Sequence, residues 1–429
     1  MIQRILALKL RFLARLYLAR FTPVIVAVTG NAGKTTTKEA VAAVLATRYR
    51  VRATGGNLNN ELGIPTTIIG EFTDRYYRSG GTFGFWLRVL VSGVWGLLRP
   101  AEYPDVLVLE FGADRPGDIR KLAAFYPPHV AVITQVGEIP VHVEYFASAR
   151  ELAQEKAALV RVLTAQDFCV LGSDDLSVLE MRSQTKAHVS TFGFGEGADV
   201  RITRLSPRLS GERPLGIGLD LTSGGNTMPL TINGTVGAGM ARAAAAAVAV
   251  GRAMDIGLAE AVEALAAMHP PAGRMRLIEG IRNTVIVDDT YNASPAAMHM
   301  AIDTVRDLPA SRRVLVLGDM LELGAHTVQA HQAAGSLAAE VADILVCVGE
   351  RARFIADAAG NQMAPERIHR AADSRAAADI VQQLIRPGDL ILVKGSQGMR
   401  MERVVAEIMA QPERASQLLV RQSARWLAK

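Results

Sequence analysis

Short runs of apolar, mostly β-branched residues alternate with longer helix-like stretches through most of the chain. Four such runs in the first half each end in glycine or in a polar cluster: VIVAVTG (24–30), DVLVLEFG (105–112), VAVITQVG (130–137) and FCVLGSDD (168–175). Continuous apolar runs of this length are typical of strands that are buried on both faces of a parallel sheet. The pattern predicts an α/β domain with ligands at the carboxyl ends of its strands.

The pattern changes further along the chain. Residues 195–235 hold scattered glycine and threonine with several short β-type runs, which predict an antiparallel stretch in the same domain. A second alternating series then begins, with TVIVDD (284–289), RVLVLGD (313–319), DILVCVG (343–349) and LILVKGS (390–396). We therefore predict a central domain with a mainly parallel sheet over residues 23–272 and a Rossmann-like α/β domain over 273–429, closed by helices after 403.

Two apolar segments do not fit this alternation. Residues 1–22 predict one basic amphipathic helix, whose arginines interrupt any signal-peptide core. Residues 83–98, FGFWLRVLVSGVWGLL, predict a helix inside an apolar insert at 75–100, and this helix is too short to span a bilayer. Two placements stay open for both segments: contact with the inner face of a membrane, or packing on the protein itself.

The net positive charge is concentrated at the start of the chain. The formal charge is +5, but five of the 47 basic residues lie in residues 1–22, and the remaining 42 balance the 42 acidic residues. Because the basic excess belongs to the N-terminal segment and no RNA- or DNA-binding motif is found elsewhere, we predict no nucleic-acid partner. Cys169 and Cys347 lie far apart in strand-like runs, which indicates buried thiols in a reducing cytoplasm.

The clearest chemistry lies in VTGNAGKTTTKE, residues 28–39. A strand, a glycine turn and a helix form the context of a phosphate loop, in which amides at the helix start bind anionic oxygens. The central domain is therefore predicted to be of the P-loop type, with Lys34 reaching the β- and γ-phosphates and Thr35 on Mg²⁺. The spacing is shorter than in the common phosphate loop because residue 28 is Val, so a plain glycine turn with an exposed lysine is the alternative.

Three further residues are candidates for metal chemistry. Glu110 comes directly after a buried strand, where a carboxylate suits a Mg²⁺ ion beside a phosphate loop. His142 and Lys156 follow along the chain. Spacing alone does not distinguish them from a structural histidine and a solvated lysine on a helix.

Seven segments in chain order resemble the Mur ligase family, and within it the branch that adds D-alanyl-D-alanine to UDP-N-acetylmuramoyl-tripeptide: VTGNAGKTTTKE, GNLNNELGIP, VLEFGADRPGDI, HVEYFAS, DDTYNASP, VLGDMLELG and VKGSQGMRMERVV. The family's own loop is T-G-x-x-G-K-T-T, which accounts for the short spacing. The resemblance implies an ATP-dependent, ADP-forming amide ligase of peptidoglycan precursor synthesis. In such enzymes ATP phosphorylates a substrate carboxylate, and an amine then attacks the acyl phosphate.

The resemblance also implies roles for single residues. Thr35 and Glu110 would hold one Mg²⁺, His142 would help to hold a second, and Lys156, as a carbamate, would bridge to that second ion. The expected catalytic residues are therefore Lys34, His142 and Lys156. The expected ATP contacts are Gly30, Asn31, Gly33, Lys34, Thr35, Thr36, Arg274, Asp289 and Asn292. The expected contacts with the muramoyl-peptide acceptor and D-alanyl-D-alanine are Asn57, Asn59, Asn60, Lys394 and Ser396.

Some of these positions carry an alternative. The three asparagines equally suit ordinary turns, and Asp288, beside Asp289, equally suits a helix cap. In GTVGAGMARAAA (234–245), the family's histidine and two asparagines are replaced by Val236, Gly237 and Met240. The last of those asparagines normally contributes to adenine recognition, so nucleotide affinity or choice is expected to differ.

The acceptor is a second open point. Family members begin with a separate domain that binds the UDP-sugar, whereas about 22 residues precede the first predicted strand here. Two alternatives to the peptidoglycan ligase follow: an amide ligase that acts on another acceptor, and a catalytically idle nucleotide-binding scaffold at the membrane. The sequence does not determine the oligomeric state.

Overall fold

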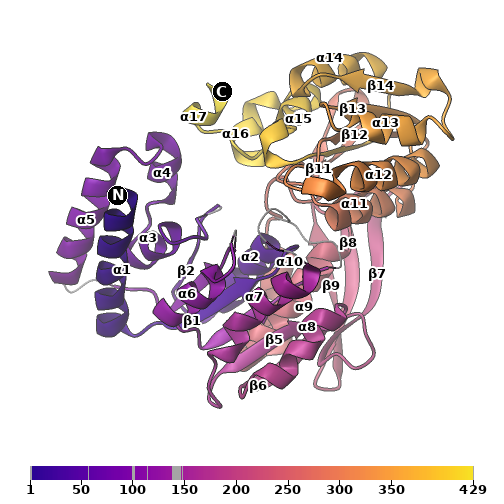
Figure 1. Ribbon diagram of the computed structural model, residues 1–429. Helices are drawn as coiled ribbons and strands as arrows, with labels where there is room; N and C mark the ends of the chain where they lie inside the picture. Colours follow the sequence, from indigo (N-terminus) through magenta and orange to yellow (C-terminus); the bar gives the residue numbers. More distant parts are fainter. Residues whose placement is uncertain are drawn as a thin grey trace.

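The computed structural model describes residues 2–56, 58–98, 102–113, 115–137, 146 and 148–428. Two sheets lie in the two halves of this part of the chain, the first covered by the indigo and magenta helices of Figure 1 and the second by the orange and yellow ones. Both sheets are mainly parallel, so the α/β fold class predicted from the hydrophobic pattern is confirmed.

Within the described residues, the larger sheet has nine strands in the order β2-β3-β1-β4-β5-β6-β7-β8-β9. Neighbouring strands from β2 to β7 are parallel, whereas β7, β8 and β9 pair antiparallel, as predicted for residues 195–235. The strands are β1 (Val24–Thr29), β2 (Val51–Ala53), β3 (Val106–Glu110), β4 (Val130–Ile133), β5 (Phe168–Gly172), β6 (His188–Gly193), β7 (Val200–Ser210), β8 (Arg213–Ser223) and β9 (Asn226–Asn233).

The second sheet has six strands in the described part of the chain, in the order β10-β11-β15-β12-β13-β14. Only its edge pair β10–β11 is antiparallel among the pairings described. The strands are β10 (Arg276–Glu279), β11 (Val285–Asp289), β12 (Arg313–Gly318), β13 (Ile344–Val348), β14 (Ile368–Ala371) and β15 (Leu390–Lys394).

Alternate residues of each strand point to opposite faces, so each sheet supports two cores. In β1, Ile25 and Ala27 join one core of the larger sheet, and Val26 and Val28 join the other. The first core is covered by α1 (Ile2–Phe21), α3 (Gly63–Ile69), α4 (Thr73–Ser79), α5 (Phe83–Leu98), α6 (Asp118–Phe125), α7 (Ala149–Arg161) and α8 (Leu176–Leu179). The second core is covered by α2 (Lys34–Leu45), α9 (Ala238–Ala253) and α10 (Leu258–Ala267).

The smaller sheet is covered in the same way. One face carries α11 (Pro295–Asp307), α12 (Thr327–Val341) and α13 (Arg353–Ala359), and the other carries α14 (Ser374–Leu384), α15 (Glu402–Ile408) and α16 (Ala415–Leu418). The last helix, α17 (Ala424–Leu427), reaches back to α4 (Figure 1). The 3₁₀ turns are η1 (Glu180–Gln184), η2 (Ile281–Asn283), η3 (Gly324–His326), η4 (Pro365–Arg367), η5 (Gln397–Met399) and η6 (Pro412–Arg414).

The two apolar segments outside the strand pattern form the helices predicted for them. Helix α5 spans the predicted range, and α1 and α5 both pack on the domain and on each other through one side. Among the described helices, none combines the length and the apolar character needed to cross a membrane. Cys169 and Cys347 are buried free thiols, and burial raises the pKa of each to about 12.

Candidate active site

The phosphate loop connects the end of β1 to the start of α2. Gly30 has φ of 146° and Gly33 has φ of 80°, backbone conformations that side chains disfavour. A Cβ at Gly30 would also lie 2.0 Å from Thr134 Oγ1. The Asn31 amide donates to the Gln135 carbonyl at 2.6 Å, so the loop is held against the chain that follows β4. Gly33 caps α2 without a side-chain acceptor, which leaves the helix-start amides available to an anion.

Lys34 and Thr35 begin α2 and point to different partners. The Lys34 ammonium donates to the carbonyls of Gly30 at 2.8 Å and Asn31 at 3.2 Å, so it lies over the loop itself. Thr36 is buried in the same helical turn. It lines a cleft that has this loop on one side and residues 289–294 on the other. All six phosphate-loop residues predicted from the sequence therefore lie together on one wall of the cleft.

Glu110 completes an oxygen cluster with Thr35. Parallel pairing of β1 with β3 sets Glu110 opposite Val28, two residues before Gly30 of the phosphate loop. The Thr35 hydroxyl donates to Glu110 Oε2 at 2.8 Å, and Asn59 Nδ2 donates to Glu110 Oε1 at 3.1 Å. A buried carboxylate beside a hydroxyl is a hard-oxygen donor set of the kind that suits Mg²⁺.

The remaining predicted metal residues divide between described and undescribed parts of the chain. Lys156 lies on α7, is buried, and lines the same cleft as Glu110, so it is not a solvated surface lysine. His142 lies outside the described residues. Within those residues, no group of three or more histidine, cysteine, aspartate or glutamate side chains is arranged to hold a metal ion.

The asparagines predicted to lie near the acceptor have separate roles. Asn59 contacts Glu110, as described above. Asn60 Oδ1 instead accepts the amides of Leu62 at 3.1 Å and Gly63 at 3.0 Å, which is the turn chemistry that the sequence left open. Both asparagines line the cleft, and Asn57 lies outside the described residues.

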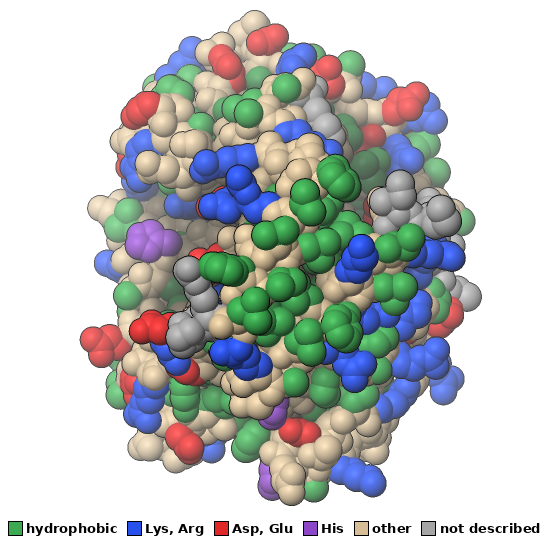
Figure 2. All heavy atoms as spheres, turned by 90° about the vertical axis from the view of Figure 1, so that its left-hand side faces the viewer, with side chains coloured by type: hydrophobic (Ala, Val, Ile, Leu, Met, Phe, Trp, Pro, Cys, Tyr) green, Lys and Arg blue, Asp and Glu red, His purple; other side chains and the backbone are tan. Residues whose placement is uncertain are grey.

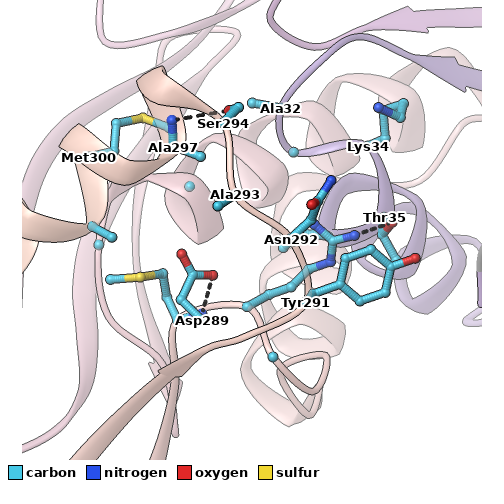
Figure 3. Close-up of a pocket in the computed structure, with 18 of the residues that line it drawn as sticks. Ala32, Lys34, Thr35, Asp289, Tyr291, Asn292, Ala293, Ser294, Ala297 and Met300 are labelled. Carbon is cyan, nitrogen blue, oxygen red and sulfur yellow. Dashed lines mark hydrogen bonds between the residues drawn. The ribbon is translucent and has the colours of Figure 1, made fainter. Parts of the chain in front are cut away.

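A loop after β11 forms the opposite wall. Figure 3 shows Tyr291, Asn292 and Ser294 facing Ala32, Lys34 and Thr35 across the cleft. The loop continues into α11, where the Ser294 hydroxyl caps the helix by accepting the Ala297 amide. The cleft between the walls has a volume of about 800 Å³.

Lys394 holds this loop in place from the end of β15. Its ammonium donates to Asp289 at 2.5 Å and to the Asn292 carbonyl at 3.1 Å. Asn292 Oδ1 accepts the Gln397 amide at 3.3 Å, and Ser396 Oγ accepts the Leu321 amide at 2.9 Å. Four predicted residues therefore lie together on this wall: Asp289, Asn292, Lys394 and Ser396. The Lys394 ammonium is already bonded to the loop.

Arg274 crosses from the second half of the chain to the phosphate loop. Its guanidinium donates to Thr35 Oγ1 at 2.8 Å and stacks on the Tyr291 ring, 4.0 Å from its centroid. Tyr291 in turn is held by Arg421, which donates to its carbonyl and to that of Thr290. The guanidinium therefore places positive charge beside the start of α2, where helix amides favour anionic oxygens.

Asp288 is fully buried behind the loop. It accepts the Gly273 amide at 3.0 Å and the Thr290 hydroxyl at 2.6 Å, so it is not a helix cap. Burial raises the pKa of its carboxyl to about 6. Gly273 has φ of 67°, which marks a turn just before Arg274. Because Asp288 accepts the Gly273 amide, it holds the turn that directs Arg274 into the cleft.

Val236, Gly237 and Met240 line the same cleft at the start of α9. Gly237 has φ of 89°, and a Cβ there would meet Thr304 Oγ1 at 2.9 Å. The three positions that depart from the family pattern are therefore apolar or close-packed parts of this wall.

Sequence reasoning missed two residues of the site. Tyr291 stands inside the segment DDTYNASP, so its place between Asp289 and Asn292 was a usable signal. Arg421 stands in a region predicted only as closing helices, and its sequence neighbours carry no signal of its contacts with the loop.

Comparisons with known proteins identify two domain families along this chain. The Mur ligase middle domain family matches residues 28–74 and 97–248, and the Mur ligase glutamate ligase domain family matches residues 273–397. The UDP-N-acetylmuramoyl-tripeptide–D-alanyl-D-alanine ligase of Bacillus subtilis is 30% identical over 406 residues, which cover 94% of this chain and 79% of that protein. The corresponding ligase of Escherichia coli is 28% identical, over 89% of this chain and 76% of its own length.

Solved structures show the same similarity. MurF from Acinetobacter baumannii superposes with a TM-score of 0.76 at 26% identity, covering 94% of this chain and 80% of that one. MurF ligase from Thermotoga maritima, solved in complex with ADP, has a TM-score of 0.75 at 26% identity and covers 94% and 83%. The two matched domain families and the similarity to these relatives show the family, and the cleft between the two sheets fits it. This chain belongs to the Mur ligase family.

Proposed function

We propose that this chain is an ATP-dependent amide ligase that joins D-alanyl-D-alanine to a muramoyl-tripeptide acceptor. The observation that carries the proposal is the single cleft in which Lys34, Thr35 and Glu110 face Arg274 and the loop after β11. The names of the curated relatives supply the two substrates.

The reaction balances in two steps. A carboxylate oxygen of the acceptor attacks the γ-phosphorus of ATP, and ADP leaves. The amine nitrogen of the dipeptide then attacks the acyl carbon, loses a proton, and phosphate leaves with the amide formed. The γ-phosphoryl group therefore goes first to a carboxylate and not to water.

The first step brings two anions together, and this chain offers cations to offset their repulsion. Lys34 lies over the phosphate loop, and Arg274 enters from the opposite wall. With the amides at the start of α2, they would stabilise the charge that spreads over the phosphoryl oxygens in the transition state. The two cations are effective only if they are in position before the reaction begins. Lys34 is held by the loop carbonyls, and Arg274 is held by the Tyr291 ring.

Thr35 and Glu110 fit Mg²⁺ by their chemistry, because both offer hard oxygens beside the phosphate loop. When bound there, the ion would supply charge neutralisation at the phosphates. Asn59 would keep the Glu110 carboxylate oriented. For a second ion we propose His142 together with Lys156, whose buried ammonium becomes an anion only as the carbamate that the family resemblance implies.

The second wall would position ATP and exclude water. Asn292 faces the phosphate loop and accepts the Gln397 amide, and Asp289 lines the same cleft and is paired with Lys394. Val236, Gly237 and Met240 would lie against the adenine side of the cleft. Because an acyl phosphate hydrolyses in water, approach of the two walls protects it.

The test is phosphate release from ATP and Mg²⁺ that requires both UDP-muramoyl-tripeptide and D-alanyl-D-alanine. We expect release to depend on both substrates, with the amide product formed in equal amount. Lys34→Ala should abolish release, whereas Lys186→Ala, at an exposed position outside the cleft, should leave it unchanged. ATP binding without phosphate release on these substrates would favour another acceptor. Phosphate release that depends on neither substrate would refute the proposed ligase activity.

A further inference from the structure

Helix α1 is apolar on two opposite sides. One side is buried against the domain through Leu10, Ala14 and Tyr17. The other side carries four exposed apolar side chains at helical spacing, with Phe12 66% exposed: Ile5, Leu8, Phe12 and Leu16. A helix that only closes its own domain needs one apolar side, so the second stripe requires a separate explanation.

Helix α5 repeats this arrangement beside α1. It is buried through Phe85, Val89 and Gly93. Its other side exposes six large apolar side chains, Phe83, Leu87, Val91, Val94, Trp95 and Leu98. The Tyr17 hydroxyl donates to the Gly93 carbonyl at 2.8 Å, and Arg20 donates to the Leu97 carbonyl, so the helices run side by side in the same direction.

The two stripes form one surface, which we name the α1–α5 face and define by the ten residues just given. Of the fifteen exposed large hydrophobic side chains in the described chain, ten belong to this face and only five are scattered elsewhere. Figure 2 shows hydrophobic side chains gathered on this side of the molecule, with basic side chains among and beside them. A concentration of this kind marks a contact surface, whereas single exposed hydrophobics do not.

The charge on this face has one sign. Neither helix contains an acidic residue. At about 100° per residue, Arg4 and Arg15 flank one edge of the α1 stripe, and Lys9 and Arg20 flank the other. These four side chains and Arg88 of α5 are exposed. Apolar stripes with basic edges are complementary to an anionic, partly apolar surface.

The helices are suited to lie along such a surface. At 1.5 Å per residue, α1 and α5 are about 30 Å and about 24 Å long. None of the described helices meets the requirements for crossing a membrane. Trp95 places an amphipathic ring on the α5 stripe, the residue type enriched where lipid headgroups meet acyl chains.

We propose that the α1–α5 face docks this protein on an anionic membrane surface. The apolar stripes enter the boundary between headgroups and acyl chains, and the basic side chains contact lipid phosphates. A second copy of the chain fits less well, because a symmetric pairing of two such faces would bring basic edges together without an acidic partner. None of the ten residues lines the cleft, so docking is independent of the proposed ligase reaction.

The experiment is flotation of the full chain with vesicles, without ATP or acceptor. Vesicles of phosphatidylglycerol mixed with phosphatidylcholine should carry the protein, and vesicles of phosphatidylcholine alone should carry much less. Phe12→Gln combined with Val91→Gln should lower the partition coefficient about tenfold or more, because two large apolar side chains no longer enter the bilayer. Raised salt should weaken binding, since part of it is electrostatic.

A matched control separates this face from exposed hydrophobicity in general. Leu176→Gln combined with Leu209→Gln changes two exposed apolar residues elsewhere, of which Leu176 is 77% exposed, and should leave flotation unchanged. Both double variants should keep the wild-type thermal midpoint, which shows that they fold. Absence of flotation on anionic vesicles, or equal flotation of the Phe12/Val91 variant, would overturn the proposal. Concentration-dependent dimers that the same variant abolishes would also overturn it, in favour of a second copy.

Discussion

The ion pair between Lys394 and Asp289 offers a test of how the C-terminal wall of the cleft is held. The two groups lie opposite each other on β15 and β11, with Nζ and Oδ2 2.5 Å apart. Lys394→Met keeps the length and apolar stem of the side chain but removes the ammonium. It leaves Asp289 without its ion-pair partner and the Asn292 carbonyl without a donor.

Burial sets the size of the effect. The side chains of Lys394 and Asp289 are 2% and 14% exposed. Removing one partner of a buried pair costs about 3–5 kcal/mol, mostly because the other charge stays buried and unpaired. Asp289 keeps some access to the cleft, so we expect the lower end, a loss of about 3 kcal/mol in the free energy of unfolding. Since the loop after β11 loses two of its anchors, kcat should fall as well.

A surface pair of similar length provides the control. Arg370 and Asp357 lie 2.6 Å apart, but their side chains are 60% and 55% exposed. Water screens such a pair, so Arg370→Met should cost less than about 1 kcal/mol.

Urea unfolding of both variants, with hydrogen exchange of the β11 and β15 amides as a local readout, makes the comparison. Adding Asp289→Asn to Lys394→Met should recover part of the lost stability, because it removes the unpaired charge. Equal losses for Lys394→Met and Arg370→Met would refute the argument from burial.

Three further predictions follow from the site. Lys34→Ala should lower the rate of acceptor-dependent phosphate release by at least about a hundredfold with an unchanged thermal midpoint, and a smaller effect would argue against its place at the phosphates. Lys156→Ala should lose activity and regain part of it when short carboxylic acids are added. The native mass spectrum of the wild type should show one added CO₂. Full activity of the variant would exclude the carbamate. Asp288, with its pKa raised by burial from 3.8 to about 6, binds its proton more tightly in the folded state, so its contribution to stability should fall by up to about 3 kcal/mol as pH rises from about 4 to about 6. The difference in urea unfolding between the wild type and Asp288→Asn measures this contribution, and a difference that does not change with pH would contradict it.

Much of the first wall of the site could be predicted from the sequence, because local rules determine it. A strand, two glycines and a helix place Lys34 and Thr35 at the helix start. Glu110 follows the next long apolar run, and parallel strands present their carboxyl ends at one edge, so its contact with Thr35 follows once β1 and β3 are neighbours. The helix at residues 83–98 was predicted with its observed bounds because its apolar run has clear ends.

The second wall could not be predicted from spacing. Arg274 and Thr35 are 239 residues apart, and their contact depends on how the two sheets pack. The family resemblance singled out Arg274, Asp289 and Asn292, but their contacts come only from the structure. The resemblance gave no sign that Lys394 would bind Asp289, since a lysine at a strand end suits a ligand equally well. The exposed apolar side of α1 could not be predicted either, because apolar residues spread around a helix do not reveal which side is buried.

These contacts join the phosphate loop to the C-terminal helices through a short series of side chains. Thr35 accepts from Arg274, Arg274 stacks on Tyr291, and the carbonyls of the Tyr291 loop accept from Arg421. Arg421 also donates at 2.7 Å to Glu402, which begins α15 and is buried. Because every contact in this series involves a charged or stacked group, and the series ends on the buried Glu402, the guanidinium that faces the phosphate loop has little freedom of its own. Its position is therefore set by the packing of the whole C-terminal domain against the nucleotide-binding domain.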